Sequence, residues 1–191
     1  NNANCETLGT ETRTCELCFI TETRAIEGVA PGHIYDEKGF CAGCGIYNVL
    51  EPTLVKIDGV WNYFENGVKT DATTVVKYKG TWYYVKDGIK NTATTLCKYK
   101  GTWYYISKGK IDFKATTVVK YKDTWYYVKN GKKNTDTTLC KYNGTWYYIN
   151  KGKIDFKATT LCKYDGKYYY VKKGKVDFKA TTLCKYNSKY Y

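Results

Sequence analysis

The stretch TTLCKYKGTWYYISKGKIDFKA (residues 94–115) decides the fold of this chain, because it recurs with small edits from residue 54 to the end. One position in it holds a large aromatic residue every 21 or 22 residues. The residues at that position are Trp61, Trp82, Trp103, Trp125, Trp146, Tyr168 and Tyr190. A fixed period of this length is typical of stacked repeat architectures.

Each repeat has the sequence pattern of a β-hairpin. Residues 96–99 and 102–106 are rich in aromatic and β-branched residues, which favour strands. The pair between them, Lys100-Gly101, is replaced elsewhere by Asn-Gly or Asp-Gly, the pairs that favour a type I′ hairpin turn. A second Gly-containing turn follows at Asn66-Gly67, Asp87-Gly88, Lys108-Gly109, Asn130-Gly131, Lys151-Gly152 and Lys173-Gly174. Since a lone hairpin is marginally stable, we predict an all-β solenoid of about seven stacked hairpins, the last truncated.

Side-chain alternation divides each second strand into two faces. In residues 102–106, Trp103 and Tyr105 share one side and Tyr104 points to the other. In the first unit Asn62 takes the place of this middle tyrosine. We therefore expect the Trp/Tyr face to form the core and the middle tyrosine to lie on the outer, wetter face.

The segments NGTWYYINKGK (143–153) and DGKYYYVKKGK (165–175) resemble the choline-binding and glucan-binding repeats of Gram-positive surface proteins. The resemblance covers roughly residues 54–191. It implies a hairpin solenoid on an extracellular, cell-wall associated protein, with ligands held in aromatic cages between successive hairpins. The candidate ligand-binding residues are then Trp82, Trp103, Trp125, Trp146, Tyr83, Tyr104, Tyr126 and Tyr147.

The chain departs from the family at the Gly-Trp dipeptide of the first strand. The residues found there are Val75-Val76, Leu96-Cys97, Val118-Val119, Leu139-Cys140, Leu161-Cys162 and Leu183-Cys184. One cage aromatic per site is therefore missing. Because a quaternary ammonium needs several aromatic faces, we expect choline to bind weakly or not at all.

Charge divides the chain into two segments. Residues 1–50 carry three basic and seven acidic residues, a net −4, whereas residues 51–191 carry 28 Lys and 11 acidic residues, a net +17, which together give the total of +13. Composition, repeat pattern and charge all change near Glu51-Pro52. We therefore predict a Cys-rich module at 1–50 and the repeat solenoid at 51–191.

The lysines of the repeats have more than one interpretation. Regularly placed Lys residues keep strand edges soluble, and the simplest interpretation is a solvated face. The second is an acidic partner such as cell-wall polysaccharide or a teichoic-acid-like anionic polymer. The repeats contain no Arg for bidentate contacts, which disfavours nucleic acid.

The Cys-rich module has the spacing of a zinc ribbon. Cys15 and Cys18 form one C-x-x-C pair, and Cys41 and Cys44 form another after 22 residues. Two such turns can hold one structural Zn²⁺ with four thiolates. A module of about 50 residues with few aliphatic side chains also needs a staple of this kind.

Two alternatives remain open for these cysteines. One is a Cys₃His site that uses Cys5, Cys15, Cys18 and His33, and the other is a set of disulfides, which an oxidising exterior favours.

In the repeats, Cys97, Cys140, Cys162 and Cys184 share a position with Val residues, so we interpret them as core, with a thiol pair between adjacent units as the alternative.

The sequence offers no set of residues for catalysis. It has one His, so a Ser-His-Asp set has a single candidate, and that His lies in the Cys-rich module. Asp112, Asp155 and Asp177 recur singly in the connectors.

There is no run of 18 apolar residues, and the absence of Met indicates a processed or excised chain. We expect a non-catalytic surface attachment module that binds cell-wall polymer or glycan; the alternatives are a structural stalk and an adhesin for a host glycan or protein.

Overall fold

The computed structural model describes residues 10–25, 32–37, 39–43, 46–49, 51–186 and 188–190. These residues form strands, turns and connecting segments, with no helix among them. The predicted all-β class is therefore confirmed. Two compact units are present, Asn1–Thr70 and Asp71–Tyr191.

The first unit contains a two-stranded hairpin and the first repeat. Strand β1 (Thr10–Thr14) pairs antiparallel with β2 (Thr21–Ala25). The first repeat follows as β3 (Thr53–Ile57), β4 (Val60–Glu65) and β5 (Val68–Lys69). Tyr47, from the segment between these two parts, contacts the first repeat: its N–H donates to the Gly67 carbonyl at 2.9 Å and its ring lies 4.8 Å from that of Phe64. The first repeat thus packs with the Cys-rich segment, and both belong to the compact unit that ends at Thr70.

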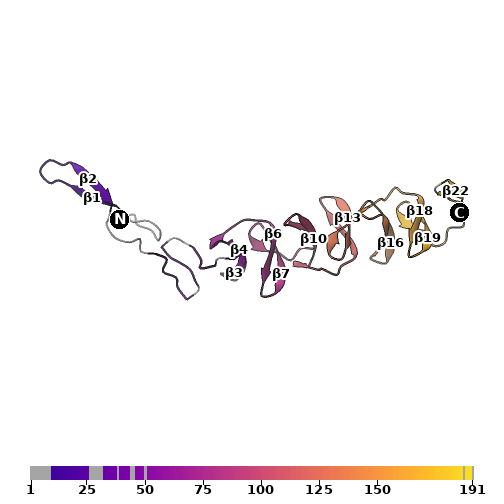
Figure 1. Cartoon of the computed structure of the whole chain (residues 1–191), viewed down its shortest axis with the longest axis horizontal. Helices are drawn as coiled ribbons and strands as arrows, with labels where there is room; N and C mark the ends of the chain where they lie inside the picture. Colours follow the sequence, from indigo (N-terminus) through magenta and orange to yellow (C-terminus); the bar gives the residue numbers. More distant parts are fainter. Residues whose placement is uncertain are drawn as a thin grey trace. The chain divides into compact units, whose positions relative to one another are not determined.

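The second unit is built from antiparallel hairpins that follow one another along the chain (Figure 1). The first hairpins are β6 (Thr74–Tyr78) with β7 (Thr81–Lys86), and β9 (Thr95–Tyr99) with β10 (Thr102–Ser107). The next are β12 (Thr117–Tyr121) with β13 (Thr124–Lys129), and β15 (Thr138–Tyr142) with β16 (Thr145–Asn150). The last are β18 (Thr160–Tyr164) with β19 (Lys167–Lys172), and the short pair β21 (Lys185–Tyr186) with β22 (Lys189–Tyr190).

Each of the five long hairpins carries a third, two-residue strand that the sequence pattern did not predict. These strands are β8 (Ile89–Lys90), β11 (Lys110–Ile111), β14 (Lys132–Lys133), β17 (Lys153–Ile154) and β20 (Lys175–Val176). Each pairs with the second strand of its own hairpin, as in Val128↔Lys133. In β11, β14, β17 and β20 the first residue also pairs with the preceding hairpin, as in Tyr104↔Lys132. The repeat is therefore a three-stranded meander rather than a hairpin with an irregular connector.

The first turn of the repeat has the predicted type I′ geometry, and the second turn, for which no type was predicted, shares its pair of positive φ angles. In the first turn Lys100 and Gly101 have φ angles of 45° and 82°, and in the second Lys108 and Gly109 have 48° and 78°. Both central residues thus lie at positive φ, as this turn type requires.

The second turn requires glycine for a further reason, which is close backbone approach. A Cβ on Gly131 would lie 2.3 Å from the carbonyl oxygen of Asp112, whereas a Cβ on Gly101 would meet nothing within 4 Å. The first turn therefore tolerates Asp123, at φ 62°, in place of glycine. The second-turn glycine also joins successive repeats, because the Gly131 carbonyl accepts a hydrogen bond from the Tyr105 N–H at 2.8 Å.

The core of the second unit lies between successive hairpins, and each inner hairpin buries both of its faces. We call the face that packs on the following hairpin the forward face. In the first such interface the forward side chains Val75, Trp82 and Tyr84 pack against Cys97 and Ile106 of the next hairpin. The expectation of one core face and one outer face was therefore wrong. The most deeply buried side chains are on the face that was expected to be outer; these are Val85, Ile106, Val128, Ile149 and Val171, each 0% exposed.

The cysteines of the repeats are part of this core. Cys97, Cys140 and Cys162 are buried free thiols, and Cys184 is half-buried. Their interpretation as small apolar core residues is confirmed for the first three.

Among the described residues there is no helix long and apolar enough to span a membrane.

Candidate functional site

A Trp–Tyr pair lies at each hairpin interface of the second unit that involves a tryptophan. The Trp of one hairpin packs edge to face on the last Tyr of the next hairpin's first strand, and the Trp rings are half-buried. The pairs and their centroid distances are Trp82–Tyr99 at 5.3 Å, Trp103–Tyr121 at 5.2 Å, Trp125–Tyr142 at 5.3 Å and Trp146–Tyr164 at 5.2 Å. This geometry is a favourable one for aromatic rings, so the pairs contribute to the coupling between neighbouring repeats.

The middle tyrosine of each second strand has one of two partners from its own repeat. Repeats with an Asp-Phe-Lys-Ala connector place a phenylalanine near it, and repeats with the shorter connector place a lysine over it. The phenylalanine pairs are Tyr104–Phe113 at 6.1 Å, Tyr147–Phe156 at 6.2 Å and Tyr169–Phe178 at 6.2 Å. The lysine pairs, from Nζ to ring centroid, are Lys90–Tyr83 and Lys133–Tyr126, both at 4.3 Å.

The connector fixes the phenylalanines by a local hydrogen bond. The carboxylate of Asp177 accepts from the backbone N–H of Lys179 at 3.0 Å, and Asp112 and Asp155 make the same bond two residues on. Such Asx turns hold the intervening residue in place. Phe178 is 68% exposed, more than its equivalents Phe113 and Phe156, which are 49% exposed each.

A small cavity of about 80 Å³ lies at the interface between the β15–β16 and β18–β19 hairpins. We call it the Trp146 cage. Its lining residues are Leu139, Trp146, Tyr164, Tyr169 and Phe178. Four of these five are aromatic, and the Tyr164 and Tyr169 rings lie 6.5 Å apart at 65°. Aromatic faces and edges that surround a cavity are suited to an organic cation or to the apolar face of a sugar.

One residue distinguishes this interface from its relatives. The second residue of the third strand packs against the interface, and it is Ile111 and Ile154 in two of the other clusters but Val176 here. Valine has one methylene fewer than isoleucine. The smaller side chain is consistent with the cavity at the Trp146 cage.

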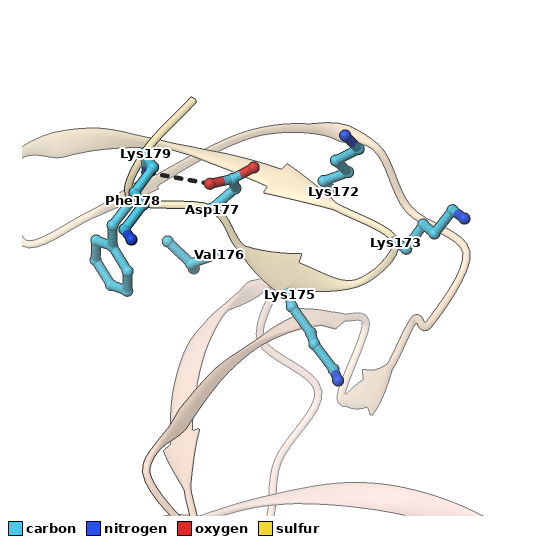
Figure 2. A pocket seen from close by; sticks show the side chains of 7 residues that line it. All are labelled: Lys172, Lys173, Lys175, Val176, Asp177, Phe178 and Lys179. Atoms are coloured by element: carbon cyan, nitrogen blue, oxygen red, sulfur yellow. Dashed lines mark hydrogen bonds between the residues drawn. The ribbon is translucent and has the colours of Figure 1, made fainter. Parts of the chain in front are cut away.

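A lysine-lined recess of about 460 Å³ lies beside the cage. Figure 2 shows its residues, which are Lys172, Lys173, Lys175, Val176, Asp177, Phe178 and Lys179. Lys172 and Lys173 point away from the chain, while Lys175 extends toward the preceding hairpin, where its Nζ lies 5.9 Å from the Tyr147 ring centroid (Figure 2). A similar recess of about 390 Å³ occurs one repeat earlier around Phe156. Both recesses combine lysine side chains with an exposed phenylalanine ring, four lysines in the first and two in the second.

The structure brings together some of the ligand-binding residues predicted from the sequence. Trp103 packs in one cluster with Tyr126, which belongs to the next hairpin. Trp103 and Tyr104 are neighbours in one strand and point to its opposite faces, so they do not share a site. Sequence reasoning missed Leu139, Tyr164, Tyr169 and Phe178. The recurrence of phenylalanine at 113, 156 and 178 was a signal that was available in the sequence.

The predicted metal ligands are described in part. Cys15 and Cys18 are exposed in the turn between β1 and β2, Cys41 is buried, and Cys5 and Cys44 lie outside the described residues. His33 stacks on Tyr35 at 5.6 Å. Within the described part of the chain, no three potential metal ligands converge.

The two C-x-x-C segments share a backbone hydrogen bond. Both read C-x-x-C-x-I, and the N–H of the first Cys donates to the carbonyl of the Ile at 2.9 Å, from Cys15 to Ile20 and from Cys41 to Ile46. Hydrogen bonds from the Cys18 thiol and from the N–H groups of Cys18 and Leu17 lower the pKa of the Cys15 thiol. Backbone N–H groups directed at sulfur are typical of thiolate metal ligands.

These features define a class of protein, namely a repeat-built binding module with aromatic rings at its hairpin interfaces. The model of the choline-binding repeat matches residues 71–91, 92–112, 114–134, 135–155 and 157–177, five segments that make up 105 of the 191 residues. The chain therefore belongs to the choline-binding repeat family. Repeats of this family are non-catalytic binding modules of cell-wall associated surface proteins.

The comparison with solved structures found matches of low identity and low TM-score. Choline-binding protein F from Streptococcus pneumoniae is 20% identical, with 97% of this chain and 71% of that one covered and a TM-score of 0.36. CbpJ from the same species is 20% identical, with 90% and 66% covered and a TM-score of 0.33. The pneumococcal cell-wall endolysin of phage Cp-1, in complex with choline, is 22% identical, with 81% and 42% covered and a TM-score of 0.32. No curated protein sequence matches the chain.

Proposed function

We propose that the chain is a cell-wall attachment module that binds small organic cations carried by a wall polymer. The Trp146 cage is the observation that carries this proposal, because four aromatic rings surround a cavity of about 80 Å³. Each aromatic face is worth on the order of 0.5–2 kcal/mol to a cation, so several rings together give useful affinity. Repeated weak sites on one polymer then add up through multivalency.

This proposal revises the expectation of weak choline binding. That expectation rested on the loss of one aromatic residue where Leu139-Cys140 replaces Gly-Trp. In the Trp146 cage Leu139 lines the cavity and Phe178, from the connector, contributes a further aromatic ring. The cage thus regains an aromatic ring from the connector of the following repeat.

Retention on a resin that bears quaternary ammonium groups tests the proposal. The chain carries a net charge of +13, so a cationic resin repels it and nonspecific retention is disfavoured. We expect retention and elution by free choline for the unmodified chain, weaker retention for Phe178→Ala, and recovery for Phe178→Tyr. Passage of the unmodified chain without delay, or equal retention of Phe178→Ala, would contradict the proposal.

The lysine-lined recesses support an anionic polymer as the carrier of these cations. The recess beside the Trp146 cage is lined by four lysines, Lys172, Lys173, Lys175 and Lys179, and by one acidic residue, Asp177. The same side chain, Phe178, lines the recess and the cage. A polymer with negative charges in its backbone and cationic substituents, such as a teichoic-acid-like polymer, matches both surfaces.

We further propose a structural zinc in the first unit, held by Cys15, Cys18, Cys41 and Cys44. The shared C-x-x-C-x-I pattern and its shared backbone hydrogen bond support two equivalent turns of the kind that hold zinc. Cys44 lies outside the described residues, so its part in the set rests on spacing alone. Elemental analysis of protein purified without chelator is expected to give about one zinc per chain; a metal-free module with its cysteines in disulfides would contradict this.

A further inference from the structure

The interface between the β9–β10 and β12–β13 hairpins has the same aromatic framework as the Trp146 cage. Leu96, Trp103, Tyr121 and Tyr126 pack there as Leu139, Trp146, Tyr164 and Tyr169 do two repeats later. We call this group the Trp103 cage. The repeat that closes it has the shorter connector, so it lacks an equivalent of Phe178.

The ammonium group of Lys133 lies against the rings of the Trp103 cage. Its Nζ is 4.3 Å from the Tyr126 centroid and 5.9 Å from the Trp103 centroid. Both distances fall within the range of a cation–π interaction. Lys133 is the second residue of β14, the position that Val176 holds in β20. The chain's own cation thus lies over the rings that an external cation would contact.

We propose that Lys133 is an internal ligand of the Trp103 cage and closes it to external organic cations. The inference rests on the proposed function in one respect, that cages of this framework bind such cations. Because Lys133 is covalently attached, its ammonium competes at an effective concentration in the millimolar range or above. A free cation with millimolar affinity is therefore displaced from this cage but not from the Trp146 cage, where the same position is an uncharged valine. Lys133 is thus a specificity-determining residue that sets which interfaces are open.

The test replaces Lys133 by the residue found at the open cage. We expect the Trp103 indole N–H signal of Lys133→Val to shift on titration with tetramethylammonium, with a midpoint at least about tenfold lower than in the unmodified chain. Lys133→Arg keeps a cation at the position and is expected to stay closed. Lys132→Val is the matched control, because Lys132 is adjacent but its Nζ lies 5.9 Å from Tyr104, on a different hairpin.

The Trp146 signal separates this inference from the proposed function. A shift of Trp146 without a shift of Trp103 in Lys133→Val would overturn the role of Lys133 and leave the proposed function intact. A shift of Trp103 in Lys133→Val without a shift of Trp146 would support the role of Lys133 and contradict the Trp146 cage. Equal titration of Trp103 in the unmodified chain and in Lys133→Val would also overturn the inference, since the cage would then be open already. Lys133→Thr gives a second small, β-branched variant if Lys133→Val does not fold.

Discussion

Trp103 and Tyr121 belong to successive hairpins, yet their rings lie 5.2 Å apart at an angle of 64°. Trp103 is on the forward face of β10 and Tyr121 is at the end of β12, so the contact joins two repeats. Because the same relationship recurs along the second unit, stability there depends on couplings between nearest neighbours.

Trp103→Ala is expected to weaken one of these couplings in the middle of the array. Burial of this Trp is partial, so we expect a loss of about 3 kcal/mol, the low end of the range for a core Trp. Denaturant unfolding should then separate into steps. Tyr168→Ala is the comparison, because Tyr168 is 45% exposed near the end of the array and its loss should mainly fray the last repeat. A single unchanged transition for Trp103→Ala would contradict this coupling.

Gly131→Ala and Gly144→Ala are expected to differ strongly, although both glycines have positive φ. A Cβ at Gly131 would lie 2.3 Å from the Asp112 oxygen and 2.5 Å from the Phe113 Cα, so the repeats would have to separate. A Cβ at Gly144 meets nothing within 4 Å, and only the conformational cost of about 1–2 kcal/mol remains. Thermal melting of the two variants measures the difference; equal melting temperatures would show that the close approach is unimportant.

Stability should fall at alkaline pH in part because of the buried thiols. Burial raises the pKa of Cys97 and of Cys140 from 9.0 to about 11. Since the folded pKa is the higher one, this contribution is fully present below about pH 9 and is lost as pH rises toward 11. Urea unfolding of Cys97→Val/Cys140→Val should show a weaker decline over that window. Valine occupies the equivalent positions 76 and 119, so the variant should fold; an identical pH profile would contradict the role of the thiols.

Zinc removal is expected to affect the first unit and to spare the repeats of the second. A chelator should unfold the Cys-rich segment, because its small core depends on the metal in our proposal. The hairpins between β6 and β20 pack on one another without any of the proposed ligands. Hydrogen exchange with and without chelator resolves the two parts, and unchanged protection in residues 10–25 would speak against zinc.

Salt should weaken binding to a wall polymer if the lysine-lined recesses contribute. Charges on exposed lysines are screened within about 8 Å at physiological ionic strength. Lys172→Gln/Lys173→Gln should reduce both the affinity and its salt dependence, since both side chains line the recess and are exposed. Binding that is insensitive to salt and to this change would indicate recognition by the aromatic cage alone.

Much of this fold could be predicted from the sequence, because its signals are local. The Gly-containing turns and the aromatic period predicted the hairpins and their stacking, and the structure confirms both. The two-residue strands such as β14 were missed, since two residues are too few to show a periodic pattern. The two buried faces were missed because the side of β10 that carries Tyr104 was expected to be an outer face. In the structure the next repeat covers one face and the preceding repeat covers the other.

The candidate site was harder to predict than the fold. Trp146 was identified from the family pattern, but Phe178 contributes from a connector in which the sequence analysis singled out only the Asp residues. Its role depends on the packing of two repeats, which no single repeat sequence contains. The role of Lys133 also depends on the packing of two repeats, because Lys133 contacts Trp103 of the preceding repeat.

The most direct test of the central claim follows the five Trp indole signals while choline is added to the unmodified chain. Our account predicts that the Trp146 signal shifts and saturates, that the Trp103 signal stays in place, and that Phe178→Ala reduces the Trp146 response. A Trp146 signal that does not move at any choline concentration, while the chain stays folded, would contradict the claim that this cage binds organic cations.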